Sequence, residues 1–174
     1  DNIYIIATTA ANIKIYRILP GGSGLDTNFD VDGIVDTGLV SADYSAAKLG
    51  GITSSAVAAD RIIVFATVNT STDAIEFQKY NNDGTAGTPA SASISAAVSL
   101  LSNPVITQLQ VDSNDSLVFV GYDDNYFFVG RCLSNLNIDT TFAPYSSTPG
   151  ILKTKYDDVN PTDGTTPQRK ANCV

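Results

Sequence analysis

A chain of 174 residues with 43% hydrophobic side chains can bury a core, so most of it is not expected to be disordered. The net charge of −8 and the scattering of the ten Lys and Arg residues argue against a nucleic-acid partner and against an anionic membrane surface. The sequence contains no run of about twenty apolar residues, so it predicts no membrane insertion.

The first predicted strands are an apolar run at 3–7 and an alternating run at 13–17, which ends in Arg17. Alternation with a period of two is typical of a strand with one buried face. The sequence Leu-Asp-Thr-Asn-Phe follows at 25–29, and Asp-Gly-Ile comes shortly after it at 32–34. This order of strand pair, cation and Asp/Phe segment is the pattern to look for further along the chain.

The middle of the chain repeats this order with changes. We expect a strand at 52–58, then paired strands at 62–66 and 75–79, the second of which ends in a lysine. The segment Asn-Asn-Asp-Gly-Thr at 81–85 keeps the turn but has no Phe. Residues 90–101 favour a strand or loop over a helix, because serines and β-branched residues are poor helix formers.

The last part of the chain restores the pattern. Strands are expected at 105–111, 117–121 and 127–131, and the third ends in an arginine. The sequence Ile-Asp-Thr-Thr-Phe at 138–142 and Gly-Ile at 150–151 copy the earlier segment. Turns rich in Asp and Asn separate the runs, as hairpins require.

Self-similarity at this spacing indicates a repeat architecture. We therefore predict an all-β fold of repeated antiparallel sheets in about three units, followed by a polar tail. The predicted ranges are 1–45, 46–100, 101–156 and, for the tail, 157–174. The first apolar run of each unit ends in a small residue, and the three units are aligned on these residues, Ala7, Ala66 and Gly121.

The two strong copies, at 25–34 and 138–151, resemble the delta-60 repeat, in which Leu-Asp-Thr-Thr-Phe precedes Gly-Ile or Gly-Val and follows a strand ending in Arg. The segment Asn-Asp-Ser-Leu-Val-Phe-Val-Gly at 114–121 is similar to the upstream half of that repeat, and the middle unit departs from it. The resemblance implies β-propeller blades, mostly in large secreted or surface-associated bacterial proteins, with no shared catalytic site.

Three blades do not close a propeller, which usually needs four or more. The first unit also opens at the second strand type, so a sheet edge is expected to lack a partner. Three solutions remain open. The chain is a fragment of a larger propeller protein, its subunits assemble edge to edge, or residues 169–174 supply the missing strand.

A candidate calcium loop occupies 28–36, with a Gly at its sixth position. Its oxygen ligands would be Asn28, Asp30, Asp32 and Asp36. Alternating oxygen donors suit a hard cation, but the twelfth position is Leu39 rather than Glu and no helices are expected around it. A structural turn is the alternative. Calcium is the only cofactor that the sequence suggests.

Two further features are candidate sites. Aromatic and acidic side chains at one hairpin could bind a carbohydrate, namely Tyr122, Asp123, Asp124 and Tyr126. Hairpin formation and core packing explain the same residues without a ligand. The two cysteines, Cys132 and Cys173, form a disulfide in an oxidising compartment or stay as thiols in a reducing one.

The chain has no His, which removes the usual Ser–His and Cys–His nucleophiles. No paired carboxylates stand in a context that predicts hydrolysis. The sequence therefore favours a non-enzymatic structural or interaction module in an extracellular, cell-surface or particle-surface assembly. Its expected partners are further copies of itself or other protein subunits, and the alternative is a carbohydrate-binding module.

Overall fold

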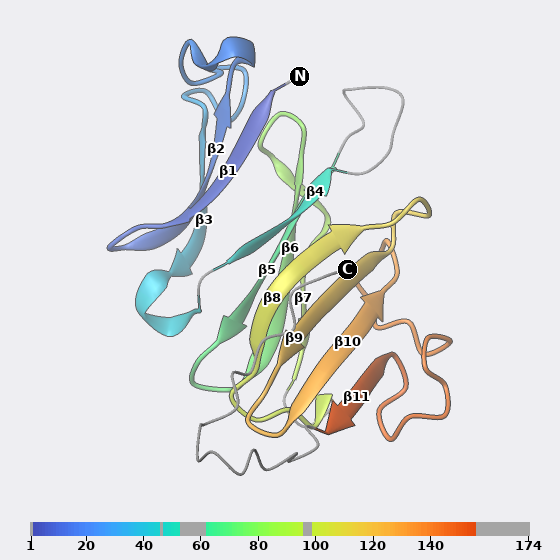
Figure 1. The fold of residues 1–174 in the computed structure, drawn as a ribbon. Coiled ribbons are helices and arrows are strands. Elements are labelled where there is room, and N and C mark those ends of the chain that lie inside the picture. The colour runs from blue at the N-terminus through green and yellow to red at the C-terminus, as the bar shows by residue number, and fades with distance from the viewer. Residues whose placement is uncertain (1, 46, 53–61, 96–98, 156–174) are drawn as a thin grey trace, which may run out of the picture.

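The computed structural model describes residues 2–45, 47–52, 62–95 and 99–155. Over these residues eleven β-strands form three separate antiparallel sheets, which confirms the predicted all-β class. Each sheet comes from one continuous stretch of the chain (Figure 1). In the described part of the chain, no helix has the length and apolar character needed to cross a membrane.

The first sheet has three strands in the order β1-β2-β3. These are β1 (Ile3–Thr8), β2 (Asn12–Ile18) and β3 (Ile34–Val40). In the ladder Tyr4 lies opposite Arg17, and Ile15 lies opposite Val35. The alternating sequence of β2 buries Ile13, Ile15 and Arg17 on one face, as the period-two pattern predicts.

The second sheet has the order β4-β5-β6-β7. Its strands are β4 (Lys48–Ile52), β5 (Ile62–Asn69), β6 (Ala74–Asn81) and β7 (Ala86–Ile94). Of the strand expected at 52–58 only Ile52 is described, as the last residue of β4, and residues 53–61 lie outside the described part. The described strand begins earlier than expected, at Lys48, and includes Gly50 and Gly51. A bulge sits at these glycines, and a Cβ on Gly50 would lie 2.6 Å from Leu109 Cδ2. Glycine at this position thus leaves room for the Leu109 side chain, which a larger residue would displace.

The third sheet has the order β11-β10-β9-β8. Its strands are β8 (Val105–Val111), β9 (Leu117–Tyr122), β10 (Tyr126–Cys132) and β11 (Ile151–Lys155). The sequence predicted the first three strands of this sheet, β8, β9 and β10, and missed β11, just as it missed β3. Both missed strands follow the Asp/Phe segment and pair with the strand that ends in arginine.

The sheets stack face to face through two apolar clusters. The cluster between the first and second sheets is formed by Ile13, Ile15, Phe29, Val35, Ile63, Phe65 and Tyr80. A larger cluster joins the second and third sheets, and the rings of Phe77 and Phe119 meet there with centroids 5.4 Å apart. We call the first strand of the second sheet and of the third sheet, β4 and β8, the leading strands; they lie side by side (Figure 1). Over the described residues, the first sheet has no counterpart of these leading strands.

The ladders correct one detail of the predicted alignment. Ala7 lies opposite Lys14, which is three residues before Arg17. Gly121 lies opposite Phe128, which is three residues before Arg131. The matching residue of the second sheet is Thr67, opposite Glu76, and not Ala66. A shift of one residue reverses the face of the sheet to which a side chain points.

Candidate functional site

A cation closes the strand before each repeat segment, and in the first sheet it is Arg17 at the end of β2. Its Nε atom forms an ion pair with Asp26 Oδ2 at 3.0 Å, and both side chains are buried. The guanidinium carbon lies 4.8 Å from the centroid of the Phe29 ring. A planar guanidinium can contact a carboxylate at its edge and a ring with its face, which explains the Arg, Asp and Phe of the motif.

Asp26 also organises the loop that carries Phe29. Its Oδ1 atom accepts the backbone N–H of Asn28 at 3.1 Å, and its own N–H donates to the Arg17 carbonyl at 2.9 Å. Gly33 closes the loop by donating to the Phe29 carbonyl at 2.7 Å, and its φ of 85° suits glycine. The hydrogen bond from the Asn28 backbone, together with the Arg17 charge, lowers the pKa of Asp26 below its ordinary value.

The third sheet repeats this cluster with Arg131, Asp139 and Phe142. The Arg131 Nη2 atom is 2.6 Å from Asp139 Oδ2, and its guanidinium carbon is 5.1 Å from the Phe142 ring centroid. Asp139 accepts the Thr141 hydroxyl at 2.6 Å, and this bond, with the adjacent arginine, lowers the pKa of Asp139. The loop closes through a Gly150 N–H bond to the Phe142 carbonyl, again at 2.7 Å.

The second sheet keeps the cation and loses the acid and the ring. Lys79 lies two residues before the end of β6, and burial lowers the pKa of its ammonium group. Its Nζ atom donates at 2.7 Å to the carbonyl of Ser134, which lies 55 residues further along the chain, between β10 and β11 of the third sheet. The cation of the second sheet therefore reaches into the third sheet.

Arg17 makes the equivalent contact between the first and second sheets: its Nη1 atom donates to the carbonyl of Asn82. Asn82 and Ser134 are equivalent residues, each the second position of a tight turn after the terminal cation. We name the first turn Leu19–Gly22, the second turn Asn81–Gly84 and the third turn Leu133–Leu136. In each, the last N–H donates to the first carbonyl, at 3.0, 3.0 and 2.8 Å.

Further contacts hold the second turn against the first sheet. The Asp30 N–H donates to the Asp83 carbonyl at 2.8 Å, and the Tyr4 hydroxyl donates to Asn82 Oδ1 at 2.8 Å. A Cβ on Gly84 would lie 2.8 Å from the Asp30 nitrogen, so only glycine fits there without movement. A polar pocket of about 400 Å³ remains beside this contact, lined by Arg17, Asn28, Asn81, Asn82 and Asp83.

The four candidate calcium ligands have separate roles. Asn28 and Asp32 contact their own loop, through Asp26 Oδ1 and the Ile34 N–H. Asp30 contributes its N–H to the second turn. Asp36 on β3 accepts hydrogen bonds from the Asn12 side chain and forms an ion pair with Lys14 at 3.8 Å. Hydrogen bonding from Asn12 lowers the pKa of Asp36. Over the described residues, no three His, Cys, Asp or Glu side chains gather as a metal would require.

The candidate carbohydrate residues surround the hairpin between β9 and β10. Asp123 Oδ1 accepts the N–H groups of Asn125 and Tyr126, at 2.7 and 2.5 Å, and so shapes the turn. Asp124 Oδ2 accepts the Asn103 side chain at 2.7 Å. Strand alternation puts Tyr122 and Tyr126 on opposite faces of the sheet, because Tyr122 lies opposite Phe127 in the ladder. The two rings are therefore not brought together on one surface.

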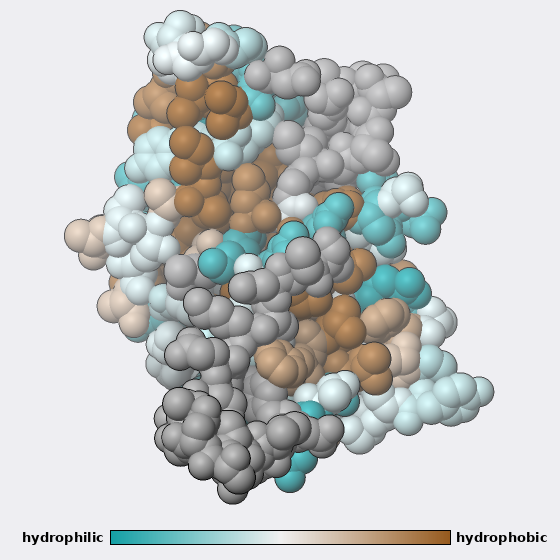
Figure 2. All heavy atoms as spheres, in the orientation of Figure 1, coloured by the Kyte–Doolittle hydropathy of each residue, from teal (hydrophilic) through white to brown (hydrophobic). Residues whose placement is uncertain are grey.

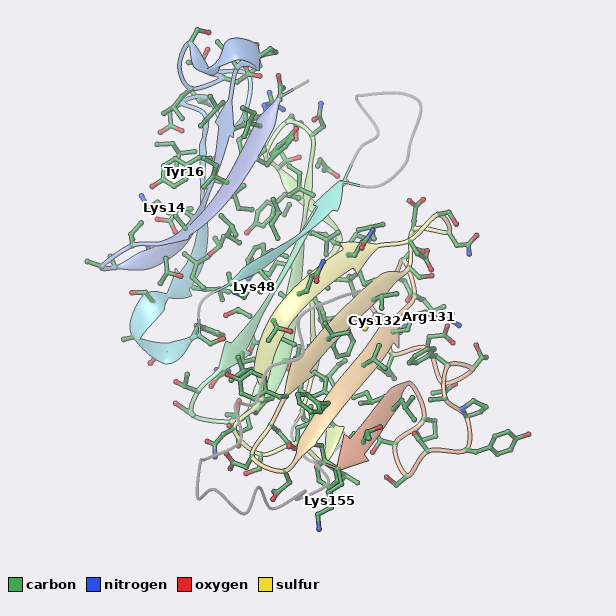
Figure 3. The ribbon with its side chains drawn as sticks, in the orientation of Figure 1. Lys14, Tyr16, Lys48, Arg131, Cys132 and Lys155 are labelled. Carbon is green, nitrogen blue, oxygen red and sulfur yellow. The ribbon has the colours of Figure 1, made fainter. Side chains whose placement is uncertain are left out.

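Cys132 ends β10 and is fully buried in the core between the second and third sheets (Figure 3). Among the described residues it has no disulfide partner, and burial raises the pKa of its thiol to about 12. Cys173 lies outside the described residues, so the proposed pairing stays a prediction.

Sequence reasoning found the three closing cations and the Asp/Phe segments but not what the cations reach. Their acceptors are the main-chain carbonyls of Asn82 and Ser134, and a main-chain acceptor leaves no side-chain signature in a sequence. The one available signal was the recurrence of a tight turn immediately after each cation. Comparison with protein-family models, with curated proteins and with solved structures found no match to this chain.

Proposed function

We propose that this chain is a non-enzymatic structural module, a stack of delta-60-type blades that assembles into a larger structure. The observation that carries the proposal is the recurring contact from the cation of one sheet to the turn carbonyl of the next. Arg17 reaches Asn82, and Lys79 reaches Ser134, through the same position of equivalent turns. A contact that is repeated from unit to unit supports propagation of the stack.

The stacking of the sheets supports a propeller-type arrangement. Leading strands β4 and β8 lie side by side, while outer strands β7 and β11 lie at the far edges of their sheets. In a propeller, blades pack face to face around an axis that their leading strands line, and three units are too few for a ring. The proposal therefore requires further blades, from other copies or other subunits.

The exposed outer face of the first sheet supports assembly as well. Strand alternation places Ile3 and Ile5 of β1 on the face that points away from the second sheet, and both side chains are exposed. In Figure 2 apolar side chains gather over this sheet, at the upper left of the view. Apolar patches of this kind mark surfaces that meet a protein partner.

Size-exclusion chromatography with light scattering tests the proposal directly. We expect a mass that rises with concentration above the 18.3 kDa of one chain, and rings or filaments in electron micrographs of the same sample. A constant mass of 18.3 kDa from micromolar to millimolar concentration would contradict self-assembly. A surface or extracellular location rests on the resemblance of the two strong repeats alone, and cell fractionation tests it.

A further inference from the structure

We infer that the outer face of the third sheet binds the first turn of a second copy of the chain. The face is formed by Arg131, Ala143 and Leu152, and the turn is Leu19–Gly22. This inference rests on the proposed assembly and names the contact that would produce it. The two surfaces lie at opposite ends of the stack, where Figure 3 labels Arg131 and, on the first sheet, Tyr16.

The junction between the first and second sheets supplies the template. Besides Tyr4, two residues of the first sheet and its loop donate hydrogen bonds to the second turn: Arg17 donates to the Asn82 carbonyl, and Asp30 donates to the Asp83 carbonyl. Val35 packs beside them, because its Cγ2 atom lies 3.1 Å from where a Gly84 Cβ would be. Together they form a socket for one glycine-containing turn.

The third sheet carries the same socket. Arg131 matches Arg17, and Ala143 matches Asp30 with nearly the same unusual φ, 47° against 46°. Leu152 matches Val35 by its place in the ladder. Val35 lies opposite Ile15 and Leu152 lies opposite Val129, and each of these partners is two residues before the closing arginine. The backbone and apolar groups that hold the second turn are thus present again.

The two sockets differ in how far they are covered. The Arg17 side chain is 4% exposed and that of Arg131 is 33% exposed. Val35 is 3% exposed, whereas Leu152 is 47% exposed. Phe29 is fully buried and Phe142 only partly. Arg131, Leu152 and Phe142 are thus each more open than their counterparts in the first socket, whereas Ala143 is half-buried and Asp30 is exposed.

The first turn has the features of the turn that the template socket holds. Its residues Pro20, Gly21 and Gly22 are exposed, and Gly22 has a φ of 73° where Gly84 has 91°. A Cβ on Gly22 would meet nothing within 4 Å in the single chain. By the template, Arg131 of one copy would donate to the Pro20 carbonyl of the next, and the Ala143 N–H to the Gly21 carbonyl.

Apolar packing also selects a second copy as the occupant. Ile63 and Phe65 of β5 are fully buried against the first sheet, and Leu117 and Phe119 of β9 against the second. Ile3 and Ile5 hold the same ladder positions on β1 and are exposed. Placing the first turn in the third sheet's socket would bury them in the same way. The contact is heterologous, so it closes a ring or extends a filament.

The test uses one variant on each side of the contact, in the full chain. Leu152→Glu places a charge in the socket and is expected to weaken self-association by roughly tenfold or more. Val31→Glu, at an exposed apolar loop residue outside the socket, is its control and should leave association unchanged. Gly22→Ala should weaken association similarly, because its Cβ would press on the Ala143 nitrogen as one on Gly84 would press on Asp30.

Gly38→Ala is the matched control for Gly22→Ala. Gly38 has the same φ of 73° and the same open surroundings, and it lies on β3, away from the turn. Both substitutions strain the backbone of the single chain equally, so their melting temperatures in dilute solution should agree. Only Gly22→Ala should reduce association.

Mixing the two interface variants decides the geometry. A Leu152→Glu chain keeps its first turn and a Gly22→Ala chain keeps its socket. At a concentration where each variant alone is mainly monomeric, an equimolar mixture should therefore form dimers. The inference is overturned if the wild-type chain self-associates but Leu152→Glu associates as strongly, or if the mixture stays monomeric. A wild-type chain that never self-associates contradicts the proposed function itself, so the two failures are distinguishable.

Discussion

The guanidinium of Arg17 donates to the main-chain carbonyl of Asn82, 65 residues away in the next sheet. The ammonium of Lys79 makes the equivalent bond to Ser134. Because the acceptor is a carbonyl, the turn side chain is free to change from Asn to Ser without loss of the contact. What each repeat must keep is a long cation at the strand end and a tight turn of fixed geometry in its neighbour.

Replacing Arg17 by Lys should destabilise the chain although the charge is kept. One ammonium group cannot contact Asp26, cover the Phe29 ring and reach Asn82 together, as the guanidinium does. We expect a loss of about 1–3 kcal/mol in the free energy of unfolding, measured by chemical denaturation. Arg131→Lys is the control, because the bonds of Arg131 stay within its own sheet. An equal loss in both variants would show that the contact between sheets contributes nothing.

Phe29 and Phe142 allow the same comparison for apolar packing. Phe29 is fully buried between two sheets, so Phe29→Ala should cost about 3–5 kcal/mol in unfolding free energy. Phe142 is partly exposed, and Phe142→Ala should cost clearly less when measured in dilute solution. Equal losses of unfolding free energy would show that packing between the first and second sheets contributes nothing to the burial of Phe29.

Acid should weaken the fold through Asp26 and Asp139. Both have pKa values below the ordinary 3.8, so folding favours their ionised forms. Their contribution to stability is complete above the unfolded value and is lost as the pH falls from about 4 through the lower folded values. We expect melting temperatures that are steady near neutral pH and fall below about pH 4.

The double variant Asp26→Asn, Asp139→Asn tests the assignment of that acid transition. It should be less stable than the wild-type chain at pH 7 and should lose less on acidification, since it has no carboxylate to protonate at either position. Asp43→Asn, in a turn outside both clusters, controls for the loss of one negative charge, which is half of the change in the double variant. A wild-type acid slope that the double variant keeps in full would assign the transition to other carboxylates.

Local pattern was enough to predict the strands that end in Arg17 and Arg131 and the repeat segments behind them. Period-two alternation and Asp-rich turns are local signals, and the structure confirms an all-β fold with three antiparallel sheets. The outer strands β3 and β11 were missed. Their sequences contain Gly38 and Thr154 and do not alternate cleanly, so their pairing depends on the neighbouring strand rather than on their own pattern.

The alignment of Ala66 with Ala7 and Gly121 failed for a physical reason. Residue size was used to align the repeats, whereas the ladder is fixed by the face that each side chain must bury. Phe65 matches Phe119 and both are fully buried, so Thr67 takes the position opposite Glu76. The candidate site was recognised in part for a similar reason, since its side chains are visible in the sequence and its carbonyl acceptors are not.

Gly84 and Gly22 occupy equivalent turn positions, and alanine should affect them differently. Gly22→Ala in the dilute chain should cost about 1 kcal/mol, which is the strain of a positive φ on a residue with a Cβ. Gly84→Ala adds a contact of 2.8 Å with the Asp30 nitrogen and should cost a further 1–3 kcal/mol or so. Thermal denaturation of the two variants measures the difference. Equal losses would mean that the second turn does not fit tightly against the first sheet.

The Cys132 thiol should be unreactive in the folded chain. Its sulfur lies in the core between the second and third sheets, and burial, with the Asp139 charge, raises its pKa to about 12, so almost no thiolate forms at neutral pH. In a Cys173→Ser chain we expect no reaction with a thiol reagent at pH 8 over the time that a small free thiol needs for completion. In denaturant the same chain should show one reactive thiol, which controls for oxidation. Fast reaction of the native variant would require the core around Cys132 to open, and it would contradict the burial of Cys132 and of Leu117, which lies opposite it in the ladder.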